Sequence, residues 1–108
     1  MSTPRIVDDI VNAYRETGRR PIRRRWFGEH KEASPFSVYT ICYGNIEGRI
    51  TANKIFEYVC NKFGNEYVFG FVSYWDNDHE IPMHTTDIVR GFRHAKLVEN
   101  RLKKEGLI

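Results

Sequence analysis

The chain has 108 residues, of which 41% are hydrophobic and 14% aromatic, so it is long enough for one globular domain, residues 1–108, and too short for two. It contains no run of about eighteen apolar residues, and its N-terminus lacks the basic, apolar and small-residue order of a secretory signal. These features argue against a membrane-spanning helix and against export. We therefore expect a cytoplasmic protein with no membrane partner.

The net charge of +3 is unevenly distributed along the chain. Residues 19–31 contain six basic side chains and one acidic side chain, so the rest of the chain carries a net charge of −2. A near-neutral, slightly acidic domain with one concentrated positive segment is typical of a protein that binds an anionic partner.

The first predicted element is a helix that begins after Thr3. Thr3 is a suitable cap, Pro4 is a suitable first helical residue, and Gly18 is suited to end the helix. Between these positions, apolar residues recur at helical spacing, at Ile6, Val7, Ile10, Val11 and Tyr14.

A basic arm, residues 19–35, follows the first helix. It opens with the sequence RRPIRRRWF, which places five arginines and two large aromatic residues within nine positions. Pro21, Gly28 and Pro35 interrupt regular secondary structure in this segment. We therefore expect an irregular arm within the domain.

Two segments are predicted to be strands. Residues 36–43, FSVYTICY, are rich in β-branched and aromatic residues and end at Gly44-Asn45, a pair suited to a tight turn. Residues 67–75, YVFGFVSYW, are apolar on both alternating faces, as expected of a central strand in which Gly70 lets a neighbour approach closely. Their aromatic side chains are interpreted as buried core, with a base-stacking platform as the alternative, at Tyr67, Phe69, Phe71 and Trp75.

Residues 52–63, between the two strands, form the clearest amphipathic pattern in the chain. Thr51 is the predicted cap and Gly64 the predicted stop of this helix. We expect its apolar face to be buried, and that face consists of Ala52, Ile55, Phe56, Val59, Cys60 and Phe63.

A polar turn at residues 76–78 is predicted after the second strand, and residues 80–83 predict a short strand at the edge of the sheet, where a proline is tolerated. Thr85 or Thr86 then caps a last helix that extends to about Glu105.

Glu99 does not fit the apolar stripe of the last helix. Two explanations remain open from the sequence. Either Glu99 lies at the margin of the stripe and pairs with Lys103 one turn later, or the segment is two helices that are broken near residues 91–94.

These elements together predict an α+β fold, in which a small mixed or antiparallel sheet packs with three helices. The sheet would contain two main strands plus a short edge strand. The predicted order along the chain is α-β-α-β-(β)-α.

The basic arm is the main candidate functional site. Guanidinium groups can form paired hydrogen bonds with phosphates, and an exposed indole can stack on a base. A second basic face is predicted on the last helix. We therefore predict a non-enzymatic nucleic-acid-binding or regulatory domain that contacts the phosphate backbone of DNA or RNA, through Arg19, Arg20, Arg23, Arg24, Arg25, Trp26, Lys31, Arg90, Arg93, Arg101 and Lys104.

Two other interpretations of the arm stay open, one structural and one functional. It can be a solvated loop that Trp26 and Phe27 anchor to the core. Because arginine and tryptophan are also common at the centres of protein interfaces, the chain can instead be a small protein-interaction module or inhibitor that docks this arm on an acidic partner protein.

A metal-dependent nuclease is the third hypothesis. The segment WDNDHEIPMH contains five possible ligands of a divalent ion, although turns favour Asp and Asn for backbone reasons alone. We therefore predict no metal site, and the weak candidate ligands are Asp76, Asp78, His79, Glu80 and His84.

No other motif in the sequence indicates an enzyme or a cofactor. The chain lacks a nucleophile elbow and a phosphate-binding glycine loop, and neither cysteine is close to a histidine in the sequence. We interpret Cys42 and Cys60 as two buried thiols, and whether they pair is left open because pairing depends on geometry.

Overall fold

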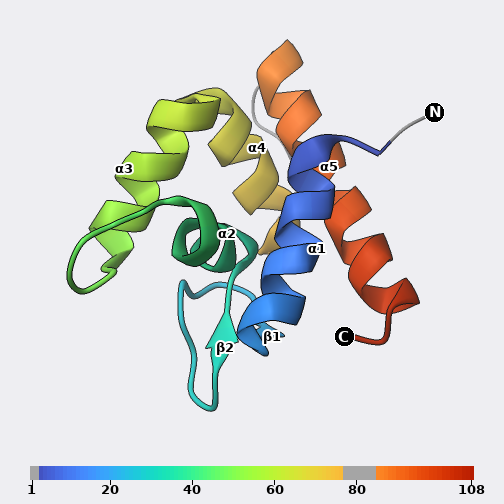
Figure 1. The fold of residues 1–108 in the computed structure, drawn as a ribbon. Coiled ribbons are helices and arrows are strands. Elements are labelled where there is room, and N and C mark those ends of the chain that lie inside the picture. Colours follow the sequence, from blue (N-terminus) through green and yellow to red (C-terminus); the bar gives the residue numbers. More distant parts are fainter. Residues whose placement is uncertain (1–2, 77–84) are drawn as a thin grey trace.

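The structure is a computed structural model that describes residues 3–76 and 85–108. Within these residues the chain forms five helices and one sheet of two very short strands (Figure 1). In chain order the elements are α1 (Arg5–Thr17), β1 (Arg20–Pro21), β2 (Glu32–Ala33), α2 (Pro35–Tyr43), α3 (Ala52–Phe63), α4 (Asn65–Trp75) and α5 (Thr86–Lys104).

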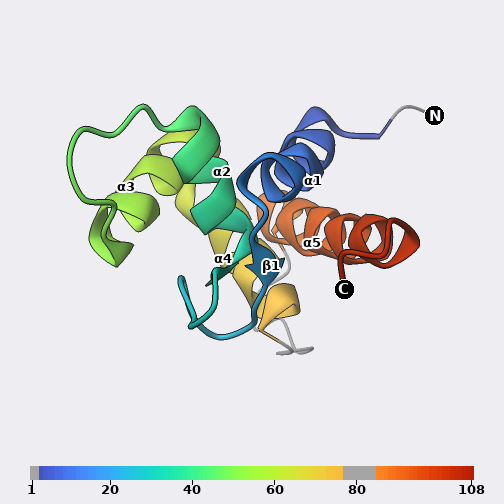
Figure 2. The same ribbon diagram turned by 60° about the horizontal axis from the view of Figure 1, so that its bottom comes forward.

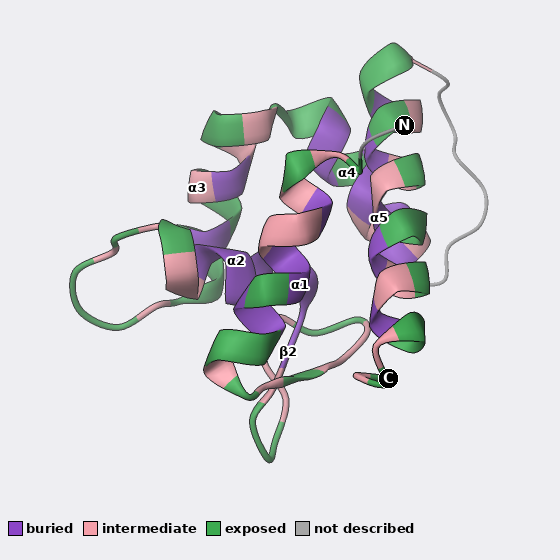
Figure 3. Cartoon of the chain, turned by 45° about the vertical axis from the view of Figure 1, so that its right-hand side comes forward, coloured by how far each residue is buried: buried purple, intermediate pink, exposed green. Residues whose placement is uncertain are grey.

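The helices pack around one buried core. Helix α1 contacts α2 and α5, α3 contacts α2 and α4, and α4 packs along α5. The two strands lie below the helices in Figure 1, and Figure 2 shows β1 beside the end of α4. Buried residues face inward on all five helices, whereas the loop before α3 and the loop between the strands are largely exposed (Figure 3). None of these helices is both long and apolar enough to cross a membrane.

The predicted α+β fold, with its mixed or antiparallel sheet and three helices, is therefore wrong. Both segments predicted to be main strands, 36–43 and 67–75, lie in helices, α2 and α4. The described sheet is instead parallel and pairs Arg20 with Glu32 and Pro21 with Ala33. The predicted edge strand at 80–83 lies outside the described residues.

Helix α2 forms because its N-terminus carries strong helix-starting residues. The Ser34 side chain accepts a hydrogen bond from the backbone N–H of Ser37, and Pro35 occupies the first helical turn. The first six residues of α2 are all buried. A helix covered on every side has no polar face, so its sequence resembles that of a buried strand.

Helix α4 was mistaken for a strand for a related reason. Tyr67, Phe71 and Trp75, which share one helical face, are at most 2% exposed. Phe69 lies on another face and is 45% exposed, so it is not part of the core. The alternating pattern expected of a strand arose from a helix with a broad buried face and one exposed aromatic residue.

Two glycines set the distance between α4 and α5. A Cβ atom at Gly70 would lie 2.0 Å from the backbone oxygen of Ile88, and one at Gly91 would lie 2.0 Å from the backbone oxygen of Tyr67. Neither position has room for a side chain. The close approach predicted at Gly70 thus occurs, but between two helices.

The amphipathic helices agree closely with their predictions. Helix α3 has the predicted bounds, with Thr51 accepting a hydrogen bond from the backbone N–H of Lys54, and α1 begins at Arg5, one residue later than predicted. Thr85 caps α5, which continues unbroken through residues 91–94. On the predicted apolar face of α3 Ala52 and Phe56 are exceptions, because both are exposed, Phe56 at 49%.

Candidate nucleic-acid interface

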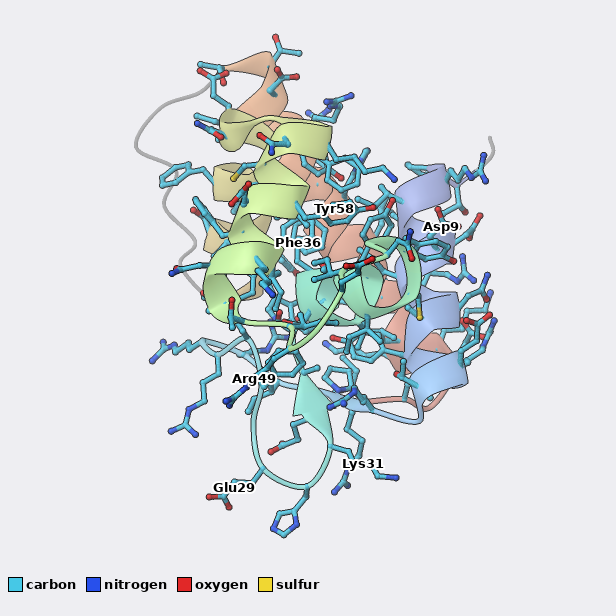
Figure 4. All side chains as sticks on the ribbon, turned by 60° about the vertical axis from the view of Figure 1, so that its left-hand side comes forward. Asp9, Glu29, Lys31, Phe36, Arg49 and Tyr58 are labelled. Atoms are coloured by element: carbon cyan, nitrogen blue, oxygen red, sulfur yellow. The ribbon has the colours of Figure 1, made fainter. Side chains whose placement is uncertain are left out.

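The basic arm leaves α1 at Gly18 and returns to the core at α2. Its backbone is held at both ends: the Arg20 N–H donates to the Lys31 carbonyl at 3.0 Å, and the Ser34 N–H donates to the Trp26 carbonyl at 2.9 Å. The buried Tyr14 hydroxyl also donates to the Ala33 carbonyl at 2.8 Å. The loop between the strands projects from the helices, and its labelled side chains Glu29 and Lys31 point away from them (Figure 4).

Arg23 is bound within the fold. Its guanidinium lies 4.5 Å from the centre of the Trp75 ring, donates to the Trp75 carbonyl at 2.6 Å and forms an ion pair with Glu99. In addition, the Trp75 indole N–H donates to the carbonyl of Ile22 at 2.7 Å. Arg23 therefore fastens the arm to α4 and α5, and its charge is already paired with a carboxylate of the fold.

This ion pair also explains why a glutamate occupies the apolar stripe of α5. The Glu99 side chain is 13% exposed, and it accepts a hydrogen bond from the Tyr74 hydroxyl at 2.7 Å as well as the bond from Arg23. Burial by itself raises the pKa of the Glu99 carboxyl, but the hydrogen bonds from Tyr74 and Arg23 outweigh it and hold the pKa below its ordinary value. The predicted contact with Lys103 is present at 3.8 Å.

Arg24 is exposed but is tied to the end of α4. Its backbone N–H donates to the Asp76 carboxylate at 2.8 Å, and its guanidinium donates to the Asp76 carbonyl at 3.2 Å. Arg24 adopts a φ of 65°, a left-handed conformation that is uncommon for a residue with a side chain. The bonds to Asp76 help to hold this turn.

The remaining arm cations have no ion-pair partner in the part of the chain that the structure describes. Arg20, Arg25 and Lys31 are exposed, and Arg19, which is partly exposed, lies 5.5 Å from the centre of the Phe27 ring. Among the residues that the structure describes, none of the four forms an ion pair with a carboxylate. We call Arg19, Arg20, Arg25 and Lys31 the unpaired arm cations.

The basic residues of α5 divide into paired and unpaired groups. Arg101 donates to Asp8 at 2.7 Å and lies 3.4 Å from Glu105, and Arg90 lies 3.4 Å from Asp87. Arg93 and Lys104 are exposed and have no ion-pair partner within residues 3–76 and 85–108. The N-terminal half of α5 lies at the opposite end of the molecule from the loop between the strands (Figure 1). The structure therefore does not join Arg90 and Arg93 to the arm.

Trp26 lies between two hollows in the surface. One is a pocket of about 140 Å³, whose lining includes Arg24, Arg25 and Trp75. The other is a more open groove of about 530 Å³, which Trp26 shares with the exposed rings of Phe56 and Phe69. These two phenylalanines were not expected to be an exposed pair, because the sequence pattern predicts Phe56 on the buried face of a helix and Phe69 in a strand.

The other candidate chemistry has little support in the described residues. Asp76 is bonded to Arg24, and Asp78, His79, Glu80 and His84 lie outside the described part of the chain. Elsewhere in that part, no group of three or more potential ligands is placed to hold a metal ion. Cys42 and Cys60 are both free, and burial raises the pKa of both thiols, as does Glu16 for Cys42, which disfavours the reactive thiolate.

Similarity to known proteins gives no indication of what this site does. Comparisons with models of protein families, with curated proteins and with solved structures give no significant match. The function has to be argued from the surface of the molecule itself.

Proposed function

We propose that this protein binds nucleic acid, with the unpaired arm cations contacting the phosphate backbone of DNA or RNA. The observation that carries the proposal is the concentration of exposed or partly exposed cations without ion-pair partners in one short segment. Arg15 and Arg101 on α1 and α5 have carboxylate partners, whereas Arg19, Arg20, Arg25 and Lys31 have none among the described residues. Unpaired cations on a slightly acidic domain favour an external anion.

The arm is also suited to this role because its backbone is fixed before any partner binds. The hydrogen bonds of β1 with the start of β2, and the attachment of Arg23 to α4 and α5, limit how far the arm can move. A cation on a fixed backbone loses less conformational entropy on binding than one on a free chain. The two roles of arginine are thus divided, since Arg23 holds the arm and its neighbours remain exposed.

Base stacking by Trp26 stays a prediction within this proposal. Its ring is partly buried against the core, so it has an anchoring role, and its free part borders the pocket beside Arg24 and Arg25. Because phosphate contact does not depend on base identity, we expect binding with little sequence preference.

Charge-matched variants test the proposal. Fluorescence anisotropy with a labelled DNA duplex and with single-stranded DNA and RNA, at about 50 mM salt, compares the wild type with two triple variants. In one variant Arg20, Arg25 and Lys31 are changed to alanine, and in the other Arg5, Arg93 and Lys96 are. We expect the arm variant to bind at least about tenfold more weakly, and the control variant to bind within about threefold of the wild type.

All six substituted side chains are exposed, so both variants should remain folded. Equal losses of affinity in the two variants would mean that binding reflects net charge alone. Absence of binding by the wild type to any of the three nucleic acids would refute the proposal.

A further inference from the structure

A second surface, distinct in chemistry from the arm, is the groove beside α4. The side chains of Phe56 and Phe69 are 49% and 45% exposed, and both line this groove. Large aromatic residues at such exposure, placed together around a hollow, typically mark a binding surface.

The shape of the groove follows from α4. The lining contains Asn65, Val68, Phe69, Val72 and Ser73 of this helix, together with its C-cap residue Asp76. These positions are spaced three, one, three, one and three residues apart, which is the spacing of one continuous helical face. The face covers about three turns and is about 16 Å long. Phe56 of α3 and Trp26 of the arm add the remaining aromatic surface.

Charge distinguishes one end of the groove. The pocket that contains Arg24 and Arg25 shares Trp26, Val72 and Asp76 with the groove, so the two hollows adjoin at the C-terminal end of α4. Arg25 is exposed and has no ion-pair partner among the described residues. A ligand that fills the groove would therefore place one of its ends close to an unpaired cation.

We propose that this groove binds a short amphipathic helix of a protein partner, with its apolar stripe on Phe56 and Phe69 and acidic residues at the end near Arg25. An apolar face about three turns long matches the length of the α4 face, and helices pack on one another through such stripes. Carboxylates at one end complement the charge of Arg25.

The lining disfavours two other ligands, a nucleic acid and a second copy of this chain. Nucleobases have polar edges that need hydrogen-bond partners, whereas five of the eight residues that line the groove are apolar, namely Trp26, Phe56, Val68, Phe69 and Val72. A second copy related by two-fold symmetry would place the same hollow surface on both sides of the interface, and two hollows do not fill each other.

Panning of a displayed library of amphipathic helical peptides against the whole chain tests the proposal. We expect enrichment of peptides that combine an apolar stripe with Asp or Glu at one end. Their affinity should fall at least about tenfold in the double variant Phe56→Ser/Phe69→Ser and should also fall in Arg25→Glu. Leu97→Ser, which removes another exposed apolar side chain, and Lys96→Glu are the matched controls and should bind as the wild type does.

Circular dichroism establishes that each variant is folded, and backbone amide shifts of ¹⁵N-labelled protein locate the bound peptide. Shifts centred on α4 support the proposal even if one variant fails to fold. No enrichment, or enriched peptides that bind the double variant as tightly as the wild type, would overturn it. Two further results would overturn it. One is a homodimer of the wild type that the double variant does not form, and the other is displacement of the peptide by oligothymidylate that itself shifts the amide signals of the groove.

This surface and the proposed nucleic-acid interface can fail independently. Phe56→Ser/Phe69→Ser should abolish peptide binding and leave nucleic-acid binding intact. Arg20→Ala/Lys31→Ala should weaken nucleic-acid binding and leave peptide binding intact, because neither residue lines the groove.

Discussion

Arg23 shows how a single residue in a charged run can have a structural role. Its sequence context, between Arg20 and Arg25, gives no sign that it differs from its neighbours. The difference is its partner, since the Glu99 carboxylate lies 76 positions away in the chain and is largely buried. Without Arg23, the Glu99 carboxylate would keep its desolvation cost, and only the Tyr74 hydroxyl and the more distant Lys103 would remain to compensate for it.

We therefore expect Arg23→Ala to lower the free energy of unfolding by about 2–4 kcal/mol at neutral pH. Arg20→Ala, which removes an exposed arginine of the same arm, should change it by less than about 0.5 kcal/mol. Urea unfolding of the two variants and the wild type measures both values.

The effect of Arg23→Ala should also depend on pH. The folded state lowers the pKa of Glu99, so this group contributes stability above its ordinary pKa of about 4.3 and loses that contribution as pH falls through the lowered value. The difference in the free energy of unfolding between Arg23→Ala and the wild type should thus be smaller when urea unfolding is repeated near pH 3. Equal stability of Arg20→Ala and Arg23→Ala at neutral pH would contradict a fastening role for Arg23.

At the scale of elements, the amphipathic helices could be predicted from the sequence and the buried ones could not. Helices α1, α3 and α5 each carry an apolar stripe opposite a polar face. Thr51 and Thr85 cap α3 and α5 as predicted, whereas α1 has Pro4 and not Thr3 at its N-cap. In α2 and α4 the neighbours cover most of the surface, so the polar face that would reveal the 3.6-residue period is absent. The Ser34-Pro35 start of α2 was the local signal that favoured a helix.

The packing of α4 on α5 gives a prediction at this scale. Replacing glycine by alanine in an exposed helix position usually stabilises it by about 1 kcal/mol. At Gly70 and Gly91 the added methyl group would meet the backbone of the opposite helix, and we expect each substitution to destabilise the fold by about 1–3 kcal/mol instead.

Thermal unfolding shows whether each variant is more or less stable than the wild type. The variants are Gly70→Ala, Gly91→Ala and the control Asn61→Ala, on the exposed face of α3. A higher midpoint for either glycine variant than for the wild type would show that α4 and α5 are not in such close contact.

The candidate site was only partly accessible to sequence analysis. The run of arginines located the basic arm, because charge density is a property of the sequence itself. Which of those arginines are engaged, and which apolar residues are exposed, depends on contacts between distant segments. Arg23 and Arg101 are engaged by Glu99 and Asp8, and Phe56 is exposed because no described element covers it fully.

At the scale of the whole molecule, four cations without ion-pair partners among the described residues are concentrated in the arm, while several cations of α1 and α5 are paired with carboxylates. Ion pairs link Arg15 to Glu105 and Arg101 to Asp8 between these two helices. The unpaired arm cations lie on the segment at the far end from the start of α5 (Figure 1). We expect an anionic partner to approach this end first, because unpaired charge determines long-range attraction.

The salt dependence of binding tests this account most directly. Each phosphate contact on duplex DNA adds about 0.9 to the magnitude of the slope of log affinity against log salt concentration. If Arg19, Arg20, Arg25 and Lys31 contact phosphates and Arg23 does not, the slope should be about −3 to −4, and Arg20→Ala or Arg25→Ala should each reduce its magnitude by about one. A slope near zero, or single-arginine variants that leave it unchanged, would contradict the account.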